Sequence, residues 1–585
     1  MTKHKVTIMP DNIEIFVEDN TTLKDNFTEY GINFEFPCGG IGVCKRCKVN
    51  IMNDDGFEEA LACQCKVKND LIVEIPRRED KHSILASGLE RDVTLDPLAK
   101  KFHMQLPYPT LKDNADDWSR LVGKNGVAPS LKVLQTLPDK LRENDFKVTV
   151  VIADNEIVSV EKGDTSHTLL GIAFDIGTTT IAGYLLNLKT GEEITQVSTL
   201  NPQIKYGADV ISRINYAKTS QGLDRLHWEI INEINKLIEK AVKQAGYSSS
   251  DIYAVTIAGN TTMHHLFLKI QPKYLVSTPY VPVVTEPLVI DANEINISIS
   301  SAGKIFVFPN IAGFVGGDTA AAALTAEIDK ADKLTLLIDI GTNGELVLGT
   351  KEKLLSCSTA AGPAFEGVEI SCGMRGATGA IDHISISNEF NYSVIGNSLP
   401  REIAGSGIVD LVAELLKVRI INENGRILRP EEIKHPIGRK YKDRIIEVNG
   451  ILSFLIEEKT ASGQPIYISQ KDVREVQLAK GAIAAGIEVL LKTYGAKAED
   501  IDQVLLAGAF GNYLNEGSVC KIGLIPSVLE GKIRGIGNAA GVGAKLSLLS
   551  EKEYNRAITL SKKINYIELS AHPDFQPVFL KKINF

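Results

Sequence analysis

Five of the eight cysteines lie between Cys38 and Cys65, where their spacing could bind a metal centre. The segment 37–47 reads PCGGIGVCKRC, and the segment 61–64 reads LACQ. A centre of two iron atoms bridged by sulfide needs four thiolates, of which three can come from one tight loop and the fourth from a distant strand. The three glycines of the loop allow positive φ angles and bring backbone N–H groups close to the sulfurs. In a reducing compartment the cluster therefore indicates metal binding before disulfides.

This cysteine segment resembles the [2Fe-2S] ferredoxins, with the C-x5-C-x2-C spacing and the LACQ motif of the adrenodoxin-like branch. The resemblance implies that Cys38, Cys44, Cys47 and Cys63 are the ligands. Cys65 would point to the same face of a strand as Cys63, where a small core residue is favoured over an alternate ligand. A zinc ribbon is disfavoured because it needs two C-x2-C pairs and the segment holds one.

A second chemistry is indicated by two copies of the sequence Asp-Ile-Gly-Thr, each after an apolar strand, in the segments 167–186 and 331–349. A polyphosphate needs backbone N–H donors, hydroxyls and a carboxylate that holds Mg²⁺ through water. Two facing hairpins of this sequence would supply all three, and their domain-scale separation predicts two similar lobes. The residues concerned are Asp175, Gly177, Thr178 and Thr179 in the first copy and Asp339, Gly341 and Thr342 in the second.

The second half of the chain resembles the actin, sugar-kinase and heat-shock ATPase superfamily, and its motifs follow the order of that superfamily. The segments 175–180 and 339–344, the latter with Asn343, match the two phosphate loops. GGDTAAA from Gly316 resembles the first connecting helix, and VLLAGAFGN at 504–512 resembles the adenosine motif. NAAGVGAKLSLL at 538–549 resembles the second connecting helix, whose small residues would let two helices cross closely at an interdomain hinge.

The superfamily resemblance implies further site residues. Gly508, Ala509, Phe510 and Gly511 would approach the nucleoside, and Arg474 and Lys480 would contact adenine on a helix entered at a capping-box-like Ser469–Asp472. Asp318 would position the attacking water, with a helix N-cap as the alternative.

Two other motifs carry weaker hypotheses. His264 and His265 are adjacent and do not share a helix face, so packing or capping is favoured over metal binding. Gly405-Ser406-Gly407 could cradle a phosphate or form a turn, and the sequence favours neither.

The elements that must position these residues indicate a multidomain α/β protein. We expect an N-terminal β-grasp ferredoxin-like α+β domain at 1–76, a charged linker at 77–92 and a small α+β middle domain at 93–166. A duplicated, ribonuclease H-like and actin-like ATPase domain of two lobes would occupy 167–585. The middle domain carries no assignable chemistry, which favours a spacer or docking module.

Composition narrows the class of function. The 585 residues carry a formal net charge of −9, which argues against a nucleic-acid binder. No apolar run reaches the length of a membrane span, and the charged start lacks a signal-peptide core. We therefore expect a cytoplasmic protein without membrane or nucleic-acid partners.

A ferredoxin-like unit followed by an ATPase of this superfamily resembles one family, the reductive activators of corrinoid proteins in methyl-transfer systems of anaerobes, such as O-demethylases and the corrinoid iron–sulfur protein. The segments 201–214, 361–381 and 468–483 also resemble that family. One branch binds [4Fe-4S] clusters through C-terminal cysteines, and it does not fit because Cys520 alone lies in the last two hundred residues. The resemblance implies a [2Fe-2S] cluster, ATP, Mg²⁺, a Co(II) corrinoid protein as partner, an external low-potential electron donor and a homodimer.

This function makes physical sense because the electron must move uphill. Plant-type [2Fe-2S] centres lie near about −400 mV, regeneration of Co(I) needs a very low potential, and each 100 mV of gap costs about 2.3 kcal/mol per electron. A nucleotide-driven closure could shift that equilibrium by its differential affinity for two states. The alternatives are a small-molecule kinase with a ferredoxin-like redox domain, a nucleotide switch for corrinoid-protein assembly, and an ATP-dependent electron activator of another low-potential enzyme.

Overall fold

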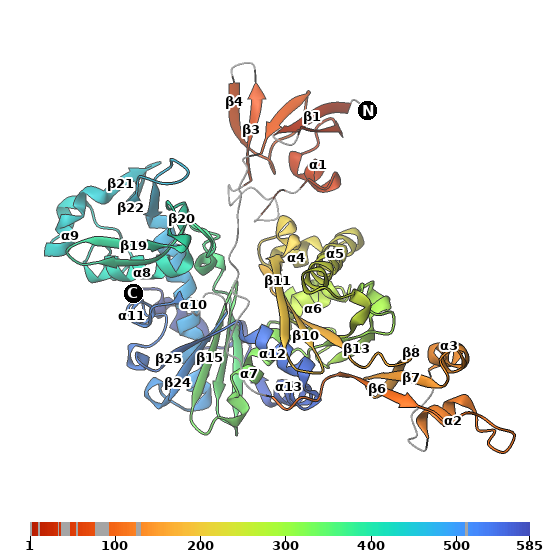
Figure 1. Cartoon of the computed structure of the whole chain (residues 1–585). Helices are drawn as coiled ribbons and strands as arrows, with labels where there is room; N and C mark the ends of the chain where they lie inside the picture. Colours follow the sequence, from red (N-terminus) through yellow and green to blue (C-terminus); the bar gives the residue numbers. More distant parts are fainter. Residues whose placement is uncertain are drawn as a thin grey trace.

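The computed structural model describes residues 3–9, 12–32, 34, 36, 47–53, 56–75, 93–123, 130–508 and 513–585. Its strands form a five-stranded sheet near the N-terminus, a three-stranded sheet after it, and two six-stranded sheets with two small inserted sheets beyond (Figure 1). The expected mixed α/β class is confirmed. The boundaries that we propose at residues 76, 92 and 166 fall between these sheets.

The N-terminal unit is a mixed sheet of strand order β2-β1-β5-β3-β4 that packs against one helix. The chain begins with a hairpin, in which β1 pairs antiparallel with β2, and β1 also pairs parallel with β5. Val6, Val49, Val73 and Phe27 are buried between sheet and helix. The elements are β1 (Lys3–Met9), β2 (Ile13–Glu18), α1 (Leu23–Glu29), β3 (Lys48–Asn53), β4 (Gly56–Leu61) and β5 (Leu71–Glu74).

The second unit is a three-stranded antiparallel sheet covered by a helix with one apolar face. Asp154 and Asn155 turn its last hairpin with φ angles of 51° and 58°, which suits a two-residue turn. The unit is fixed to the second half of the chain, since Asp96 and Leu98 donate backbone hydrogen bonds to Leu549 and Leu548. The elements are β6 (Ala99–Gln105), α2 (Asp117–Val122), α3 (Leu131–Arg142), β7 (Lys147–Ala153) and β8 (Glu156–Lys162).

The first lobe is a six-stranded sheet of order β11-β10-β9-β12-β14-β13 with helices on its faces. Its longest helix, α5, is capped at its C-terminus by Gly246, whose φ of 74° is left-handed. The elements are β9 (Leu170–Ile176), β10 (Thr180–Asn187), β11 (Glu193–Leu200), η1 (Pro202–Tyr206), α4 (Val210–Tyr216), α5 (Ser220–Ala245), η2 (Ser249–Asp251), β12 (Ile252–Gly259), α6 (Thr261–Phe267), η3 (Lys273–Val276), β13 (Leu288–Asp291), η4 (Ala292–Ile295), β14 (Lys304–Val307), α7 (Gly317–Thr325) and η5 (Ile328–Lys330).

The second lobe repeats this plan in a sheet of order β25-β24-β15-β16-β17-β26. In each lobe the strand with the Asp-Ile-Gly-Thr sequence lies between its antiparallel hairpin partner and a parallel strand. The main elements are β15 (Thr335–Ile340), β16 (Gly344–Gly349), β17 (Leu354–Thr359), η6 (Pro363–Glu366), α10 (Gln470–Tyr494), η10 (Ala498–Asp500), β24 (Gln503–Ala507), α11 (Glu516–Lys521), η12 (Ser527–Leu529), β25 (Ile533–Gly537), α12 (Ala539–Leu549), α13 (Glu551–Lys563), β26 (Ile564–Tyr566), η13 (Leu569–Ala571) and α14 (Phe575–Lys582).

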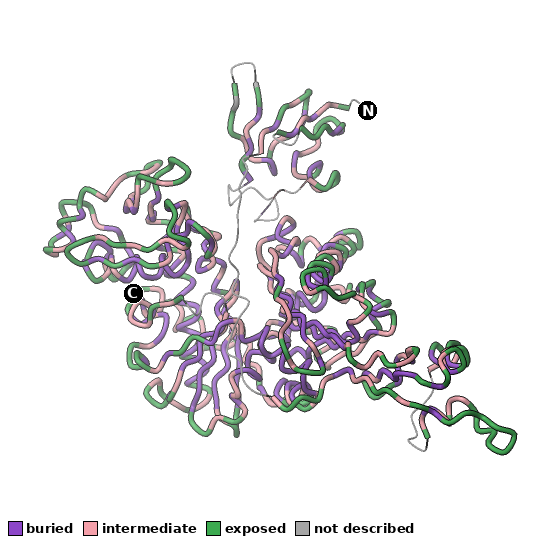
Figure 2. The backbone as a smooth tube through the Cα atoms, in the orientation of Figure 1, coloured by how far each residue is buried: buried purple, intermediate pink, exposed green. Residues whose placement is uncertain are grey.

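An insertion between η6 and α10 adds two small three-stranded sheets and two α-helices to the second lobe. Its elements are β18 (Ala380–Ile386), β19 (Phe390–Val394), η7 (Ile395–Asn397), β20 (Glu402–Ile403), α8 (Gly405–Lys417), η8 (Pro430–Glu432), α9 (Pro436–Lys440), η9 (Lys442–Arg444), β21 (Ile445–Val448), β22 (Ile451–Glu457) and β23 (Ile466–Ser469). Figure 2 shows buried backbone concentrated in the two six-stranded sheets and the helices between them. Among the described helices, none has the length and apolar character needed to cross a membrane.

Candidate functional site

The cysteine site lies at one end of the N-terminal sheet. Cys47 immediately precedes β3, and Cys63 lies in the turn that follows β4. Both are buried, and their Sγ atoms are 3.1 Å apart. Two thiolates on one tetrahedral iron atom lie somewhat farther apart than this, so a small side-chain movement would let both sulfurs bind the same iron, and the described half of the predicted ligand set is compatible with a [2Fe-2S] cluster. Cys38 and Cys44 lie outside the described residues.

Cys65 does not lie on a strand, so the expected shared face with Cys63 is wrong. Residues 62–64 form a turn, in which the N–H groups of Gln64 and Cys65 both donate to the carbonyl of Leu61. The Cys65 side chain is half-buried against the core, and burial raises the pKa of its thiol. The turn therefore separates the surroundings of Cys65 from those of Cys63.

The nucleotide candidates converge on a cluster of four carboxylates. Asp175 and Asp339 each lie one residue before the end of their strands, β9 and β15, and Asp318 lies in the first turn of α7. Glu345 joins them on β16, directly opposite Asp339 in the antiparallel pair, where facing side chains are neighbours. The sequence reasoning missed Glu345, although the hairpin register of DIGTNGE places it there.

Burial and mutual repulsion raise the pKa of every member of this cluster. The pKa of Asp175 and of Asp339 is raised to about 7, first by burial and then by the charge of Asp318. Burial raises the pKa of Asp318 to about 6, and the pKa of Glu345 is raised by burial and by the charges of Asp318 and Asp339. Among the described residues no three of these side chains are arranged to hold a metal ion directly, so a divalent cation at this cluster would be bound through its water ligands.

Asp318 is not the N-cap of its helix, so that alternative is wrong. The helix α7 is capped by Gly316 and begins at Gly317, and the Asp318 carboxylate accepts a 2.7 Å hydrogen bond from the N–H of Thr319. A Cβ on Gly316 would lie 2.5 Å from the Cα of Asn260, which explains the glycine. The Asp318 side chain thereby belongs to the carboxylate cluster.

The first phosphate loop is held in place by three polar residues that the sequence reasoning did not name as site residues. The Asn201 amide donates to the carbonyl of Gly177 at 2.9 Å, and the Asn260 amide donates to Thr178 Oγ1 at 2.9 Å. The fully buried Arg213 donates to the carbonyl of Thr178, and burial lowers its pKa to about 9. These contacts fix the backbone of the loop.

The two loops meet in space, as the duplication predicted. Thr179 Oγ1 of the first lobe lies 3.3 Å from Thr342 Oγ1 of the second. In the second loop the N–H of Gly341 donates to the carbonyl of Asn343 at 2.9 Å, which closes a tight turn. The loops thus bring hydroxyls and backbone from both lobes beside the carboxylates.

The remaining nucleotide candidates are placed as follows. Gly508 follows β24 with a φ of +90°, and Ala509, Phe510 and Gly511 lie outside the described residues. Arg474 and Lys480 both lie on α10, as predicted. Arg474 is exposed, whereas Lys480 is buried and donates to the carbonyl of Asn584. Their adenine contacts stay a prediction.

The connecting helices α7 and α12 cross closely, as their small residues predicted. A Cβ on Gly543 would lie 2.2 Å from the carbonyl oxygen of Ala321. Thr325 Oγ1 donates to the carbonyl of Ala539 at 2.7 Å. The crossing lies between the two lobes in Figure 1, where a change in lobe orientation would act on it.

The histidine pair and the glycine pair have structural roles in the described part of the chain. His265 is buried and bonded through both ring nitrogens, to Thr261 and Val283, and His264 is buried with a pKa lowered to about 3. Gly405–Gly407 begin α8, where a Cβ on Gly407 would lie 2.5 Å from the carbonyl of Ile381. The segment is therefore a packed helix start rather than a turn.

Family models cover nearly the whole chain. Residues 6–68 match the model described as "2Fe-2S iron-sulfur cluster binding domain", and residues 88–167 match "RACo linker region". Residues 170–331 match "RACo middle region", and residues 333–585 match "C-terminal domain of RACo the ASKHA domain". The first match supports a [2Fe-2S] cluster, and the last supports ATP binding.

Individual proteins show the same likeness. The chain is 34% identical to "Corrinoid activation enzyme RamQ" of Eubacterium limosum, over 98% of this chain and 97% of that one. It is 26% identical to "[Co(II) methylated amine-specific corrinoid protein] reductase" of Methanosarcina barkeri, over 71% of this chain and 77% of that one. The solved structure "Reductive activator for corrinoid,iron-sulfur protein" is 35% identical with a TM-score of 0.78, covering 100% of this chain and 98% of that one.

Proposed function

This chain belongs to the family of reductive activators of corrinoid proteins, and from that premise we propose that nucleotide hydrolysis between its two lobes drives an electron from a [2Fe-2S] cluster to Co(II) of a corrinoid protein. One observation carries the proposal. Carboxylates from both lobes meet beside two touching phosphate loops, in a chain that also places two buried thiols 3.1 Å apart.

The nucleotide half of the proposal assigns a role to each group on the loops. Thr178, Thr179 and Thr342 donate hydroxyl hydrogen bonds to phosphate oxygens, and the glycine turns let the backbone approach them. Asp175 and Asp339, one on each lobe, would hold Mg²⁺ through its water ligands. Bound Mg²⁺ supplies the positive charge that this cluster needs, and it offsets the repulsion that raises the carboxyl pKa values.

Asp318 is assigned to orient the water that attacks the terminal phosphate. Its pKa of about 6 leaves it mostly ionised near neutral pH and able to accept a proton from water. Glu345, beside Asp339, extends the acceptor set on the second lobe.

The redox half of the proposal rests on the cysteine loop. Cys38, Cys44, Cys47 and Cys63 hold the cluster, which supplies a one-electron carrier when bound. The buried positions of Cys47 and Cys63 keep water from their sulfurs on one side. We propose that an external low-potential donor reloads this site and that the linker expected at residues 77–92, which joins it to the rest of the chain, sets its reach toward cobalt.

Coupling between the halves follows from differential affinity. Nucleotide binding stabilises whichever lobe arrangement gives both loops access to the phosphates, and it can shift electron transfer only by that preference. We propose that this arrangement favours a complex in which Co(II) is destabilised or Co(I) is trapped. A homodimer remains part of the proposal on family grounds.

Reduction of a Co(II) corrinoid protein, followed by its visible spectrum with and without Mg-ATP, tests the proposal. We expect Co(I) to accumulate only with reduced protein and Mg-ATP together. Equal Co(I) yields without nucleotide, or none with any corrinoid partner, would remove the proposed coupling. Phosphorylation of a small molecule without any effect on cobalt would favour the kinase alternative.

A further inference from the structure

Glu366 joins the two phosphate loops to each other. Its Oε2 accepts a 2.6 Å hydrogen bond from Thr179 Oγ1 of the first lobe. Its Oε1 accepts a 2.8 Å hydrogen bond from Thr342 Oγ1 of the second lobe. One carboxylate thus accepts a hydrogen bond from a threonine hydroxyl of each lobe.

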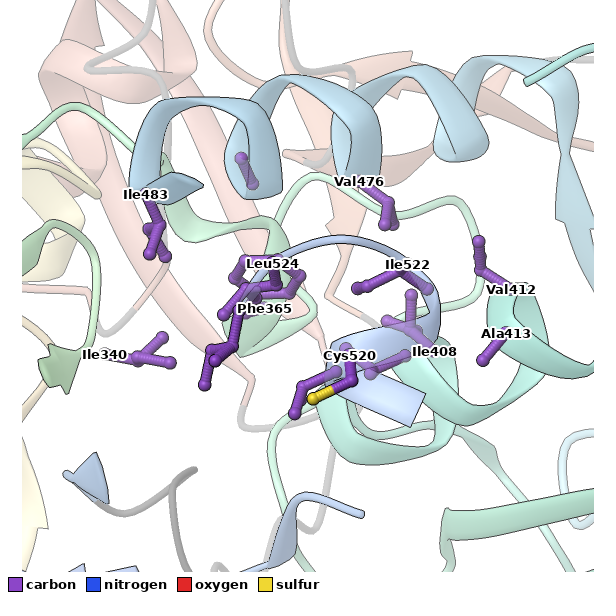
Figure 3. Close-up of a cluster of buried hydrophobic side chains, with 14 of the residues drawn as sticks. Ile340, Phe365, Ile408, Val412, Ala413, Val476, Ile483, Cys520, Ile522 and Leu524 are labelled. Carbon is purple, nitrogen blue, oxygen red and sulfur yellow. The ribbon is translucent and has the colours of Figure 1, made fainter. Parts of the chain in front are cut away.

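The backbone that carries Glu366 is fixed. The short helix η6 runs between Gly362 and Gly367, whose φ angles are +74° and +75°. A Cβ on Gly367 would lie 2.5 Å from the carbonyl oxygen of Met374, so the chain is tightly packed there. Phe365 is buried beneath α10 among Ile340, Ile483 and Leu524, as Figure 3 shows. The side chain of Glu366 can therefore turn while its backbone stays in place.

The hydroxyls that Glu366 occupies are those assigned to the phosphates. A hydroxyl carries one hydrogen, so Thr179 and Thr342 cannot donate to Glu366 and to a phosphate oxygen at once. A carboxylate and a phosphate at the same place also repel each other. A bound nucleotide must therefore take these donors away from Glu366.

We propose that Glu366 is a positioning residue that stands in for phosphate. In the nucleotide-free protein it ties the two loops together, and it releases both hydroxyls when phosphates arrive. The exchange lowers nucleotide affinity and eases release of ADP, because the freed hydroxyls return to Glu366. This inference rests on the proposed function. It adds that nucleotide binding breaks the hydrogen bonds by which Glu366 joins Thr179 of one lobe to Thr342 of the other.

Glu366→Gln tests the exchange by removing its charge. Hydrogen bonds to a charged group are roughly twice as strong as neutral ones. We expect Mg-ADP to bind about tenfold more tightly to Glu366→Gln than to the wild type, measured by isothermal titration. A merely structural role would weaken nucleotide binding instead. Glu369→Gln, an exposed carboxylate three residues away, is the matched control and should bind Mg-ADP as the wild type does.

A double-mutant cycle that combines Glu366→Gln with Thr342→Val tests the hydroxyl for which Glu366 and the phosphate would compete. Thr342→Val alone should weaken Mg-ADP binding, and it should cancel much of the gain from Glu366→Gln, because the hydroxyl that Glu366 competes for is gone. Independent, additive effects of the two substitutions would contradict the competition. Far-UV circular dichroism and thermal melting report whether the lobes of each variant are folded.

The outcomes separate this inference from the proposed function. No Mg-ADP binding by the wild type would remove both, whereas wild-type binding with equal or weaker affinity in Glu366→Gln would overturn the inference alone. Should the variants fail to fold, the wild-type structure with Mg-ADP decides. Glu366 must then have left Thr179 and Thr342, and persistence of both hydrogen bonds beside bound nucleotide would overturn the inference.

Discussion

Gly508 lies against Asp339 so closely that a Cβ at position 508 would sit 2.8 Å from Asp339 Oδ1. The same Cβ would lie 2.9 Å from the carbonyl oxygen of Ile340, and the φ of Gly508 is +90°. The start of the predicted adenosine motif is thus in contact with a carboxylate of the second phosphate loop. Only glycine satisfies both the conformation and the contact.

Gly508→Ala should therefore disturb the nucleotide site as well as the backbone. We expect a loss of about 1–3 kcal/mol in the free energy of unfolding and a weakening of Mg-ADP binding by roughly tenfold or more. Chemical denaturation and isothermal titration measure the two effects. Gly531→Ala is the control, since Gly531 has a φ of +82° and no atom within 4 Å of its Cβ position. Equal Mg-ADP affinities in both variants would show that the Asp339 contact is unimportant.

The raised carboxyl pKa values predict an unusual pH dependence of stability. The folded pKa of Asp175 and of Asp339 is about 7, against an ordinary value of 3.8. A carboxyl group with a raised folded pKa contributes stability below its unfolded pKa and loses it as the pH rises through the folded pKa. The nucleotide-free protein should therefore lose stability between about pH 4 and pH 7.

Asp339→Asn should flatten this pH dependence while it abolishes ATP hydrolysis. At pH 8 we expect the variant to be more stable than the wild type by about 1–2 kcal/mol, measured by thermal melting from pH 5.5 to pH 8. Asp332→Asn is the control, because Asp332 is an exposed carboxylate paired with Lys351. A wild-type slope that matches the slope of Asp339→Asn would contradict the raised pKa.

Glu345 offers a test of the residue that sequence reasoning missed. Glu345→Gln keeps the shape of the side chain and removes a charge beside Asp339. We expect ATP hydrolysis to fall by about 10²-fold, the size of effect seen when one charged group of a preorganised site is lost. The cluster spectrum should not change. Glu352→Gln, at an exposed position on the same lobe, should hydrolyse ATP at the wild-type rate, and similar rates in the two variants would exclude Glu345 from the site.

Substitution of a cluster cysteine should abolish the redox activity and leave ATP hydrolysis intact, the reverse of the effect expected for Glu345→Gln. Cys47→Ser should lose the visible spectrum of the cluster and the reduction of Co(II), while ATP hydrolysis persists, because the phosphate loops lie on other sheets. Cys65→Ser is the matched control and should retain both the spectrum and electron transfer. Loss of the cluster in Cys65→Ser with retention in Cys47→Ser would reverse the assignment of the ligands.

The sequence by itself determined the features that depend on local backbone and spacing. The cysteine loop, the two Asp-Ile-Gly-Thr hairpins and the small residues of the connecting helices each lie within one short segment. Such segments carry their own conformational requirements, because glycines, β-turn residues and apolar strands act on their neighbours. The superfamily order of these segments then indicated two lobes, and Thr179 and Thr342 do meet.

Only the tertiary structure decided which distant side chains complete the site. Arg213, Asn201 and Asn260 hold the first loop from three separate elements, and Glu366 reaches both loops from η6. Their positions follow from the packing of whole sheets and helices, which no local pattern encodes. The same packing determines the electrostatics. The sequence indicated Asp175, Asp318 and Asp339, but their mutual repulsion with Glu345 arises only when the two lobes bring all four carboxylates into one half-buried cluster.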